Sequence, residues 1–430
     1  MSRKTPTNVP DELRRSLGVT DAVVIGLGSM IGAGIFAALA PAARAAGSGL
    51  LFGLAVAAVV AYCNATSSAR LAAHYPASGG TYVYGRERLG EFWGYLAGWS
   101  FVVGKTASCA AMALTVGTYA WPEQAHAVAV AAVVALTAVN LRGVQKSAVL
   151  TRLIVAIVLA VLGAVVGAAL TSPTADSARL VFGSDVTVGG VLQAAGLLFF
   201  AFAGYARIAT LGEEVRDPAR TIPRAIPLAL GVTLLVYAVV AAAALTVLGP
   251  QGLSEATAPL SRLVLEVGAS WLEPVVRAGA VVAALGSLLA LILGVSRTAL
   301  AMARDRHLPH ALAAVHPRFA VPYRAEVAVG VIVAVATTTI DVRAAIGFSS
   351  FGVLLYYAVA NAAAWTLTPA EGRPARVIPV LGLAGCLVLA FTLPGRSVLA
   401  GAAVVAVGTV VYVARHRFAS SATTTPKDWQ

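Results

Sequence analysis

GSMIGAGIF, at residues 28–36, decides the fold because it places three glycines inside a long apolar segment. A second interruption, FAFAGYA at residues 200–206, breaks another such segment. A membrane-spanning helix satisfies its own backbone N–H and C=O groups, so irregular backbone at that depth is tolerated only where protein or a polar cavity supplies partners. In secondary transporters such broken helices hold charged substrate groups and coupling ions. The two interruptions therefore predict a binding site within a membrane.

The composition is typical of an integral membrane protein. Of the 430 residues, 59% are hydrophobic and 12% are charged, whereas a soluble domain has about a quarter charged residues. Twelve apolar runs approach the roughly 20 residues needed to cross the hydrocarbon layer. They lie at residues 20–46, 49–70, 92–120, 125–141, 149–171, 189–212, 225–248, 272–296, 325–340, 344–367, 377–394 and 397–414. We therefore expect twelve transmembrane helices in an all-α membrane protein, the ninth being short.

The distribution of positive charge predicts the orientation. The chain carries 31 Lys and Arg residues and a formal net charge of +12. With a cytoplasmic N-terminus, 23 of them fall in inside segments, six in outside segments and two, Lys105 and Arg207, within spans. The positive-inside rule then places both termini in the cytoplasm. No basic stripe with interleaved aromatic residues occurs outside the spans, so nucleic-acid binding is not expected.

The two interruptions lie five spans apart, in the first and sixth spans. A unit of five spans enters the membrane from opposite sides in its two copies, which indicates an inverted repeat. We expect a cytoplasmic segment at 1–19, repeats at 20–171 and 172–367, two further spans within 368–418 and a disordered cytoplasmic tail at 419–430.

Four motifs carry a family resemblance. They are GSMIGAGIF, PASGGTYVYGRERLGEFWGYLAGW at 76–99, GEEVRDPARTIPRAI at 212–226 and SRTALAMARDRHLP at 296–309. In this order, over about residues 18–320, the chain resembles the amino acid–polyamine–organocation (APC) superfamily of permeases. The resemblance implies the five-plus-five inverted repeat of the bacterial leucine transporter, with broken helices 1 and 6 and two C-terminal helices. It also implies secondary transport, mostly of amino acids.

Gly32, Ala33 and Gly34 form a candidate anion site. Free backbone N–H groups would open the second half of the first span, and an exposed helix N-terminus attracts negative charge. The glycines would let a ligand approach the backbone closely. By resemblance, this motif holds the substrate α-carboxylate. The alternative is close helix packing through small residues.

Carbonyls just before the breaks form a candidate ammonium site. Those of Ser29, Met30, Phe200 and Ala203 are expected to lack helical partners, and Gly204 opens the second break. By resemblance, carbonyls from both spans receive the substrate α-amino group, and an aromatic ring at the Phe200 position closes over the ligand. From the residues alone the hydrophobic core is the favoured place for Phe200, and it is the resemblance that favours the gate.

The side-chain pocket departs from that of some relatives, which carry an acid where this chain has Ala206. A buried cation needs a partner, so the missing carboxylate favours a neutral or acidic amino acid over a cationic one. Arg207 follows directly. It either contributes to selectivity or pairs with Glu213 or Glu214.

Lys105 lies in the middle of the third span, where an amine costs about 2.5–3.5 kcal/mol. Such a group must lose its proton or find an anion. Three roles remain open: proton coupling, contact with an anionic group, and a structural contact to a helix end. By resemblance, light subunits of heteromeric amino acid transporters often have Lys or Arg here, although the proline that follows theirs is Thr106 in this chain.

The sequence does not identify the coupling ion. Several proton-coupled bacterial relatives place a lysine in the fifth span where this chain has Val158. In the eighth span Ser287 has no neighbouring hydroxyl, which argues against a sodium site. A coupling proton, exchange and facilitated diffusion are all retained. Charged residues of two segments are expected to meet on the cytoplasmic face: Glu213, Glu214, Arg216, Asp217 and Arg220 with Arg304, Asp305 and Arg306.

We therefore predict an amino acid permease of the cell membrane that works by alternating access. A permease or exchanger of polyamines or other organic amines is the alternative. A membrane enzyme would need a polar catalytic cluster, and the sequence has none, so no enzyme, metal or cofactor is expected. A sensor without transport is the third option. Expected partners are the substrate and the lipid bilayer, with the chain a monomer or a weak homo-oligomer.

Overall fold

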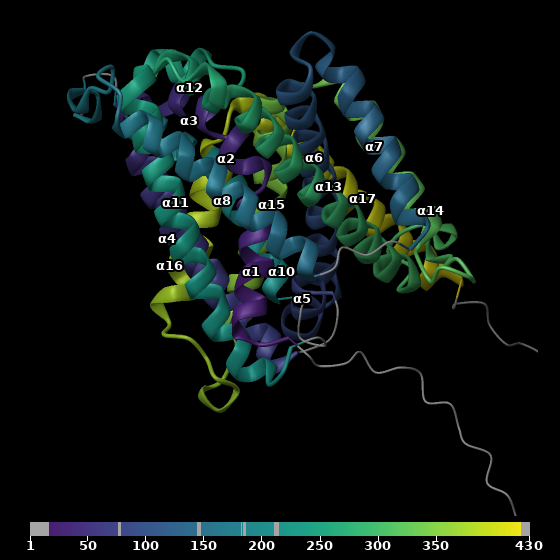
Figure 1. Cartoon of the computed structure of the whole chain (residues 1–430). Helices are drawn as coiled ribbons and strands as arrows, with labels where there is room; N and C mark the ends of the chain where they lie inside the picture. Colours follow the sequence, from purple (N-terminus) through teal and green to yellow (C-terminus); the bar gives the residue numbers. More distant parts are fainter. Residues whose placement is uncertain are drawn as a thin grey trace, which may run out of the picture.

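A computed structural model describes residues 17–75, 79–143, 148–181, 183, 186–209 and 215–422. All regular elements within these ranges are helices, apart from one isolated bridge between Leu17 and Val215. Figure 1 shows the long helices side by side, with α3 and α12 at one end of the bundle and α5 at the other.

The α-helices of the first part are α1 Val19–Met30, α2 Ala33–Ala37, α3 Leu39–Ala46, α4 Leu50–His74, α5 Thr81–Leu89, α6 Glu91–Ala120, α7 Ala125–Leu141 and α8 Ala148–Leu170. Those of the second are α9 Val188–Phe202, α10 Ala206–Ala209, α11 Pro218–Glu255, α12 Pro259–Glu266, α13 Glu273–Arg304, α14 Tyr323–Thr339, α15 Val342–Trp365, α16 Val377–Thr392 and α17 Gly395–Ala422. Short 3₁₀ turns are η1 Gly47–Gly49, η2 Pro122–Gln124, η3 Ser177–Leu180, η4 Ala203–Tyr205, η5 Ser270–Leu272, η6 His310–Ala313 and η7 Pro369–Glu371.

Ten helical segments of the described residues are long and apolar enough to cross a membrane. The expected runs at 325–340 and 377–394 correspond to α14 and α16, which have 17 and 16 residues. Both are shorter than the roughly 20 residues of a straight span. The chain is therefore a multi-pass membrane protein with about ten clear spans.

Helix α6 is central to the bundle because it packs against both α13 and α15. Its Gly104 meets Gly352 of α15 so closely that a Cβ on Gly104 would lie 3.2 Å from the Gly352 Cα. Small residues allow such close helix contact in membranes, where apolar burial gives little driving force. This crossing fixes the position of the neighbouring Lys105.

Backbone and charged contacts close the end of the bundle that carries Leu17. The backbone N–H of Arg216 donates to the Leu17 carbonyl at 2.9 Å. Nearby, Arg152 of α8 forms an ion pair with Asp21 of α1. These contacts tie the start of α1 to α8 and to the segment before α11.

Asp305, one residue of the expected charge cluster, has its partners on a third segment. Its carboxylate accepts from the Tyr82 hydroxyl at 2.5 Å and from Arg86 at 2.9 Å, both on α5. Arg220 pairs with its own neighbour, Asp217, at 3.6 Å. The partners of Asp305 belong to α5, a short helix that hydropathy did not predict. Glu213 and Glu214 lie outside the described residues.

Candidate functional site

The first interruption is a tight turn between α1 and α2. Helix α1 ends at Met30, Ile31 has φ −79° and ψ 56°, and the Gly32 N–H donates to the Met30 carbonyl at 2.8 Å. These dihedral angles are those of an inverse γ-turn. Helix α2 then begins at Ala33, and the first N–H groups of a helix have no partner within it.

The second interruption departs less from helical backbone than the first. Helix α9 ends at Phe202, tightens into the 3₁₀ turn η4 and continues as α10. Its backbone lies directly against the first interruption: a Cβ on Gly204 would be 2.2 Å from the Ser29 carbonyl oxygen and 2.7 Å from the Met30 nitrogen. Only glycine allows two backbones to approach this closely. The structure therefore brings Ser29, Met30 and Gly204 together.

The glycines of the first motif make two different contacts. A Cβ on Gly34 would lie 2.7 Å from both the Cα and the Cβ of Ala201 on α9, so Gly34 serves close helix packing. A Cβ on Gly32 would lie 2.1 Å from the Ser287 Oγ of α13. That hydroxyl is buried and has no hydrogen-bond partner within the part of the chain that is described. The Ser287 hydroxyl thus lies directly against Gly32.

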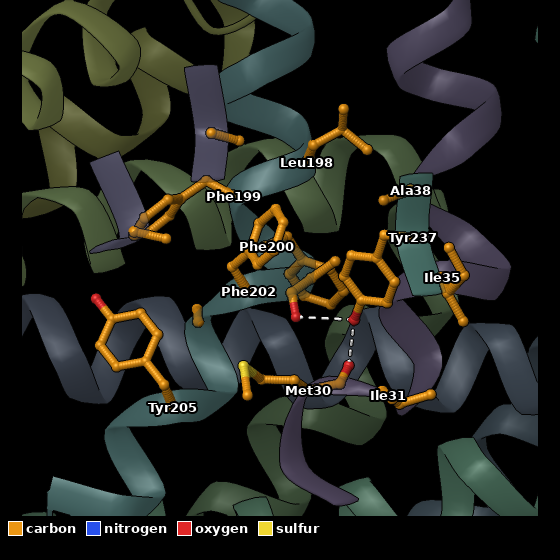
Figure 2. Close-up of a cluster of buried hydrophobic side chains, with 14 of the residues drawn as sticks. Met30, Ile31, Ile35, Ala38, Leu198, Phe199, Phe200, Phe202, Tyr205 and Tyr237 are labelled. Atoms are coloured by element: carbon orange, nitrogen blue, oxygen red, sulfur yellow. Dashed lines mark hydrogen bonds between the residues drawn. The ribbon is translucent and has the colours of Figure 1, made fainter. Parts of the chain in front are cut away.

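A tyrosine hydroxyl joins the two interruptions. Tyr237 of α11 lies 2.5 Å from the Met30 carbonyl oxygen and 3.1 Å from that of Ala201 (Figure 2). Hydropathy did not identify Tyr237. Its one signal in the sequence is a polar hydroxyl near the middle of the long apolar run 225–248.

Lys105 reaches the second interruption from α6. Its side chain is 7% exposed, and its Nζ donates to the Ala203 carbonyl at 3.3 Å. An ammonium group has three N–H donors. No carboxylate of the described ranges lies within ion-pair distance of it. Two donors are therefore available to another acceptor.

The remaining candidates lie along α9 and α10. Phe200 is buried in the cluster of apolar side chains that Figure 2 shows beside Tyr237. Ala206 and Arg207 begin α10, and Arg207 is partly buried. Its expected partners, Glu213 and Glu214, lie outside the described residues.

A cavity of 320 Å³ lies beyond α2, on the side of α3. The Tyr119 hydroxyl, which donates to the Phe36 carbonyl at 3.1 Å, is at its wall. Charged groups of both signs surround it: Arg44, Glu255, Asp341 and Arg343. The cavity thus lies at the C-terminal end of α2, where charged side chains line it.

Comparisons with known proteins identify a family and several relatives. The family described as "Amino acid permease" matches residues 17–414. An uncharacterized transporter of Mycobacterium tuberculosis (strain ATCC 25618 / H37Rv) is 74% identical over 95% of this chain and 93% of its own length. The cationic amino acid transporter 7, chloroplastic, of Arabidopsis thaliana is 29% identical over 82% of this chain and 65% of its own length. The branched-chain amino acid permease BcaP of Bacillus subtilis is 26% identical over 94% of each chain.

Proposed function

Because the chain belongs to the amino acid permease family of the APC superfamily, we propose that it moves an amino acid across the plasma membrane by alternating access. Family membership makes it a transporter embedded in a membrane. The proposal adds twelve spans in a five-plus-five inverted repeat, with α1–α2 and α9–α10 as the two broken helices and both termini in the cytoplasm. Its main support is the contact of Gly204 with Ser29, because it joins the two interruptions in one place.

The substrate would lie between the two interruptions. Its carboxylate would accept hydrogen bonds from the backbone N–H groups of Gly32, Ala33 and Gly34, where a helix start favours negative charge. Its ammonium group would donate to carbonyls before the breaks, those of Ser29, Met30, Phe200 and Ala203. Transporters of this design use half-helix ends in the same way.

In this pose the substrate would have to replace hydrogen bonds that are already present in the structure. The Gly32 N–H and the Tyr237 hydroxyl donate to the Met30 carbonyl, and Lys105 donates to the Ala203 carbonyl. Substrate binding would therefore exchange these internal bonds for bonds to the ligand. Phe200, which belongs to the apolar cluster beside Tyr237, would cover the bound molecule, and the Ser287 hydroxyl next to Gly32 would be free to bind either the ligand or a coupling ion.

A neutral or acidic amino acid is the proposed substrate. Ala206 supplies no carboxylate for a cationic side chain, while Lys105 and Arg207 supply positive charge. Relatives differ in this respect, since one is named for cationic and another for branched-chain amino acids. A permease or exchanger of polyamines or other organic amines is the alternative.

Competition for transport tests the proposal. The full chain is reconstituted in lipid vesicles, after a thermal-shift screen of amino acids and amines has identified ligands, because a ligand of the folded state stabilises it. We expect neutral or acidic amino acids to outcompete arginine, lysine and putrescine. Amides of the same amino acids should fail to compete, since they lack the carboxylate. Dominant competition by the cations would favour the organic-amine alternative, and binding without transport would indicate a sensor.

A further inference from the structure

A fully buried carboxylic side chain lies away from the substrate interruptions, where α7, α13 and α14 meet. Glu326 is in the first turn of α14 and its side chain is 0% exposed. Figure 1 shows these three helices gathered on one side of the bundle, and each packs against the other two. An acid inside a membrane segment marks a functional group by default, because its charge is costly there.

The hydrogen bonds around Glu326 fit a neutral acid. The hydroxyl of Ser296 on α13 lies 3.0 Å from the Leu293 carbonyl oxygen and 3.4 Å from Glu326 Oε1. A hydroxyl has one proton to donate, and the shorter bond goes to Leu293. Donation from Ser296 to Glu326 Oε1 is therefore the longer and weaker of the two bonds, whereas a protonated carboxyl group can donate its own proton to the Ser296 oxygen.

The second carboxyl oxygen leads to the same conclusion. Glu326 Oε2 is buried and has no hydrogen-bond partner within the described ranges. An ionised carboxylate accepts hydrogen bonds at both oxygens, and a buried charge without partners is strongly unfavourable. A neutral acid leaves only one weakly polar oxygen unsatisfied.

No neighbouring basic group of the described residues forms an ion pair with Glu326. Helix α14 packs against α6, α7, α13 and η6. The titratable and charged groups of those elements, of the residue after α7 and of α14 itself are Glu91, Lys105, Cys109, Tyr95, Tyr119, His126, Arg142, Glu273, Arg277, Arg297, Arg304, His310, Tyr323 and Arg324. Within the described residues no Lys, Arg or His among them lies within 4.0 Å of the Glu326 carboxyl group, and Arg297, next to Ser296, is exposed.

We propose that Glu326 is a proton-binding site whose loading and release accompany transport. When the proton leaves, the carboxylate must gain water or a cation, so α14 and α13 must separate at Ser296. Ser287, whose hydroxyl lies against Gly32, is on α13 as well, nine residues and about 13.5 Å from Ser296. Helix α13 thus connects the proton site to the substrate interruption.

Infrared spectroscopy tests the proton site without any substrate. The full chain in lipid vesicles is titrated from acidic to alkaline pH, and the carbonyl stretch of a neutral carboxylic acid is followed. We expect a neutral-acid band at neutral pH that disappears in Glu326→Gln. The control is Glu266→Gln, which changes an exposed glutamate of α12 and should keep the band. A band that is absent from the unmodified chain, or unchanged in Glu326→Gln, would overturn the proposal.

A transport experiment tests the coupling, and this part rests on the proposed function. The amino acid that wins the competition experiment is the probe, and an acid-outside pH difference is imposed. With one coupled proton, each pH unit supports about tenfold accumulation. Glu326→Gln, which imitates the protonated acid, should lose this accumulation but retain exchange of substrate for substrate. Glu266→Gln should retain both.

A second variant covers the case in which Glu326→Gln abolishes exchange too. Ser296→Ala removes the neighbouring hydroxyl and keeps the acid, so it should shift the pH of half-maximal uptake while accumulation persists. Accumulation that survives in Glu326→Gln, or an unshifted pH profile in Ser296→Ala, contradicts coupling through Glu326. If no amino acid is transported at all, the proposed function fails, and the infrared titration still decides whether Glu326 binds the proton.

Discussion

The amine of Lys105 lies 3.3 Å from the carbonyl oxygen of Ala203, a residue 98 positions away in the sequence. This bond connects the central helix α6 to the 3₁₀ turn η4. The acceptor is one of the carbonyls that we propose for the substrate ammonium group. Lys105 therefore stands where its charge can influence both the substrate and the second interruption.

Lys105→Ala should weaken substrate binding at every pH. The two N–H donors that Ala203 does not use would face the substrate, and a hydrogen bond to a charged group contributes about 1.5–3 kcal/mol. The apparent Kd should rise about tenfold or more, and Lys105→Arg, which keeps the charge, should retain part of the affinity. If Lys105 instead carries the coupled proton, Lys105→Ala will remove the pH dependence of uptake while exchange persists. Unchanged affinity and pH profile would leave only a structural contact.

Gly204→Ala should damage both stability and transport. Its Cβ would lie 2.2 Å from the Ser29 carbonyl oxygen, which belongs to backbone and cannot rotate away. Overpacking of this kind costs about 1–3 kcal/mol. The matched control is Gly163→Ala on α8, where a Cβ meets nothing within 4 Å. Thermal unfolding and uptake measure the effect, and equal behaviour of the two variants would show that the close backbone contact is not required.

Tyr237→Phe should lower the unfolding temperature. The hydroxyl bonds the carbonyls of Met30 and Ala201, and a buried acceptor left without its partner costs about 1–3 kcal/mol. Tyr62→Phe is the control, because Tyr62 is 47% exposed on α4. A thermal shift no larger than that of Tyr62→Phe would mean that water replaces the hydroxyl at this position.

Both termini should face the cytoplasm, because 23 Lys and Arg residues lie on that side of the proposed map and six on the other. Reporters fused after residue 248 should be active outside the cell, and reporters fused after residue 320 should be active inside. The reverse pattern would invalidate the orientation and the twelve-span map together.

Lowering the pH should remove the stabilisation that Glu371 provides through its contacts with Thr368 and Arg88. The hydrogen bond from the Thr368 backbone N–H, and after it the ion pair with Arg88, holds the pKa of Glu371 at about 2, below its usual 4.5. A depressed pKa stabilises the fold above the unfolded-state value, and the contribution is lost as pH falls from about 4.5 to about 2. The difference in unfolding temperature between the unmodified chain and Glu371→Gln should shrink over this interval. A difference that grows with acidity would contradict the ion pair.

Hydropathy predicted the long helices well because apolar length determines where a chain can cross a membrane. The runs 92–120 and 125–141 correspond closely to α6 Glu91–Ala120 and α7 Ala125–Leu141. It missed the extent of α11, which begins before the run 225–248 and continues past a kink at Gly249, with φ 66°. Helical backbone outside the apolar layer leaves no hydropathy signal.

Contacts between distant residues were not predictable in the same way. The sequence indicated Gly34 as a place where a ligand reaches the backbone. In the structure a Cβ at Gly34 already meets Ala201, so Gly34→Val would also disturb packing. Tyr237 and Glu326 were missed, although a lone acid in an expected span is itself a signal.

The pairing of Leu17 with Val215 has a kinetic consequence. The Arg216 amide that donates to the Leu17 carbonyl can exchange its hydrogen with water only when this end of the bundle separates. Its hydrogen-exchange rate would then report how often this end of the bundle opens, even when no substrate is transported. Hydrogen exchange at this single backbone amide would thus measure the rate of opening, and a ligand that holds the bundle closed would slow the exchange.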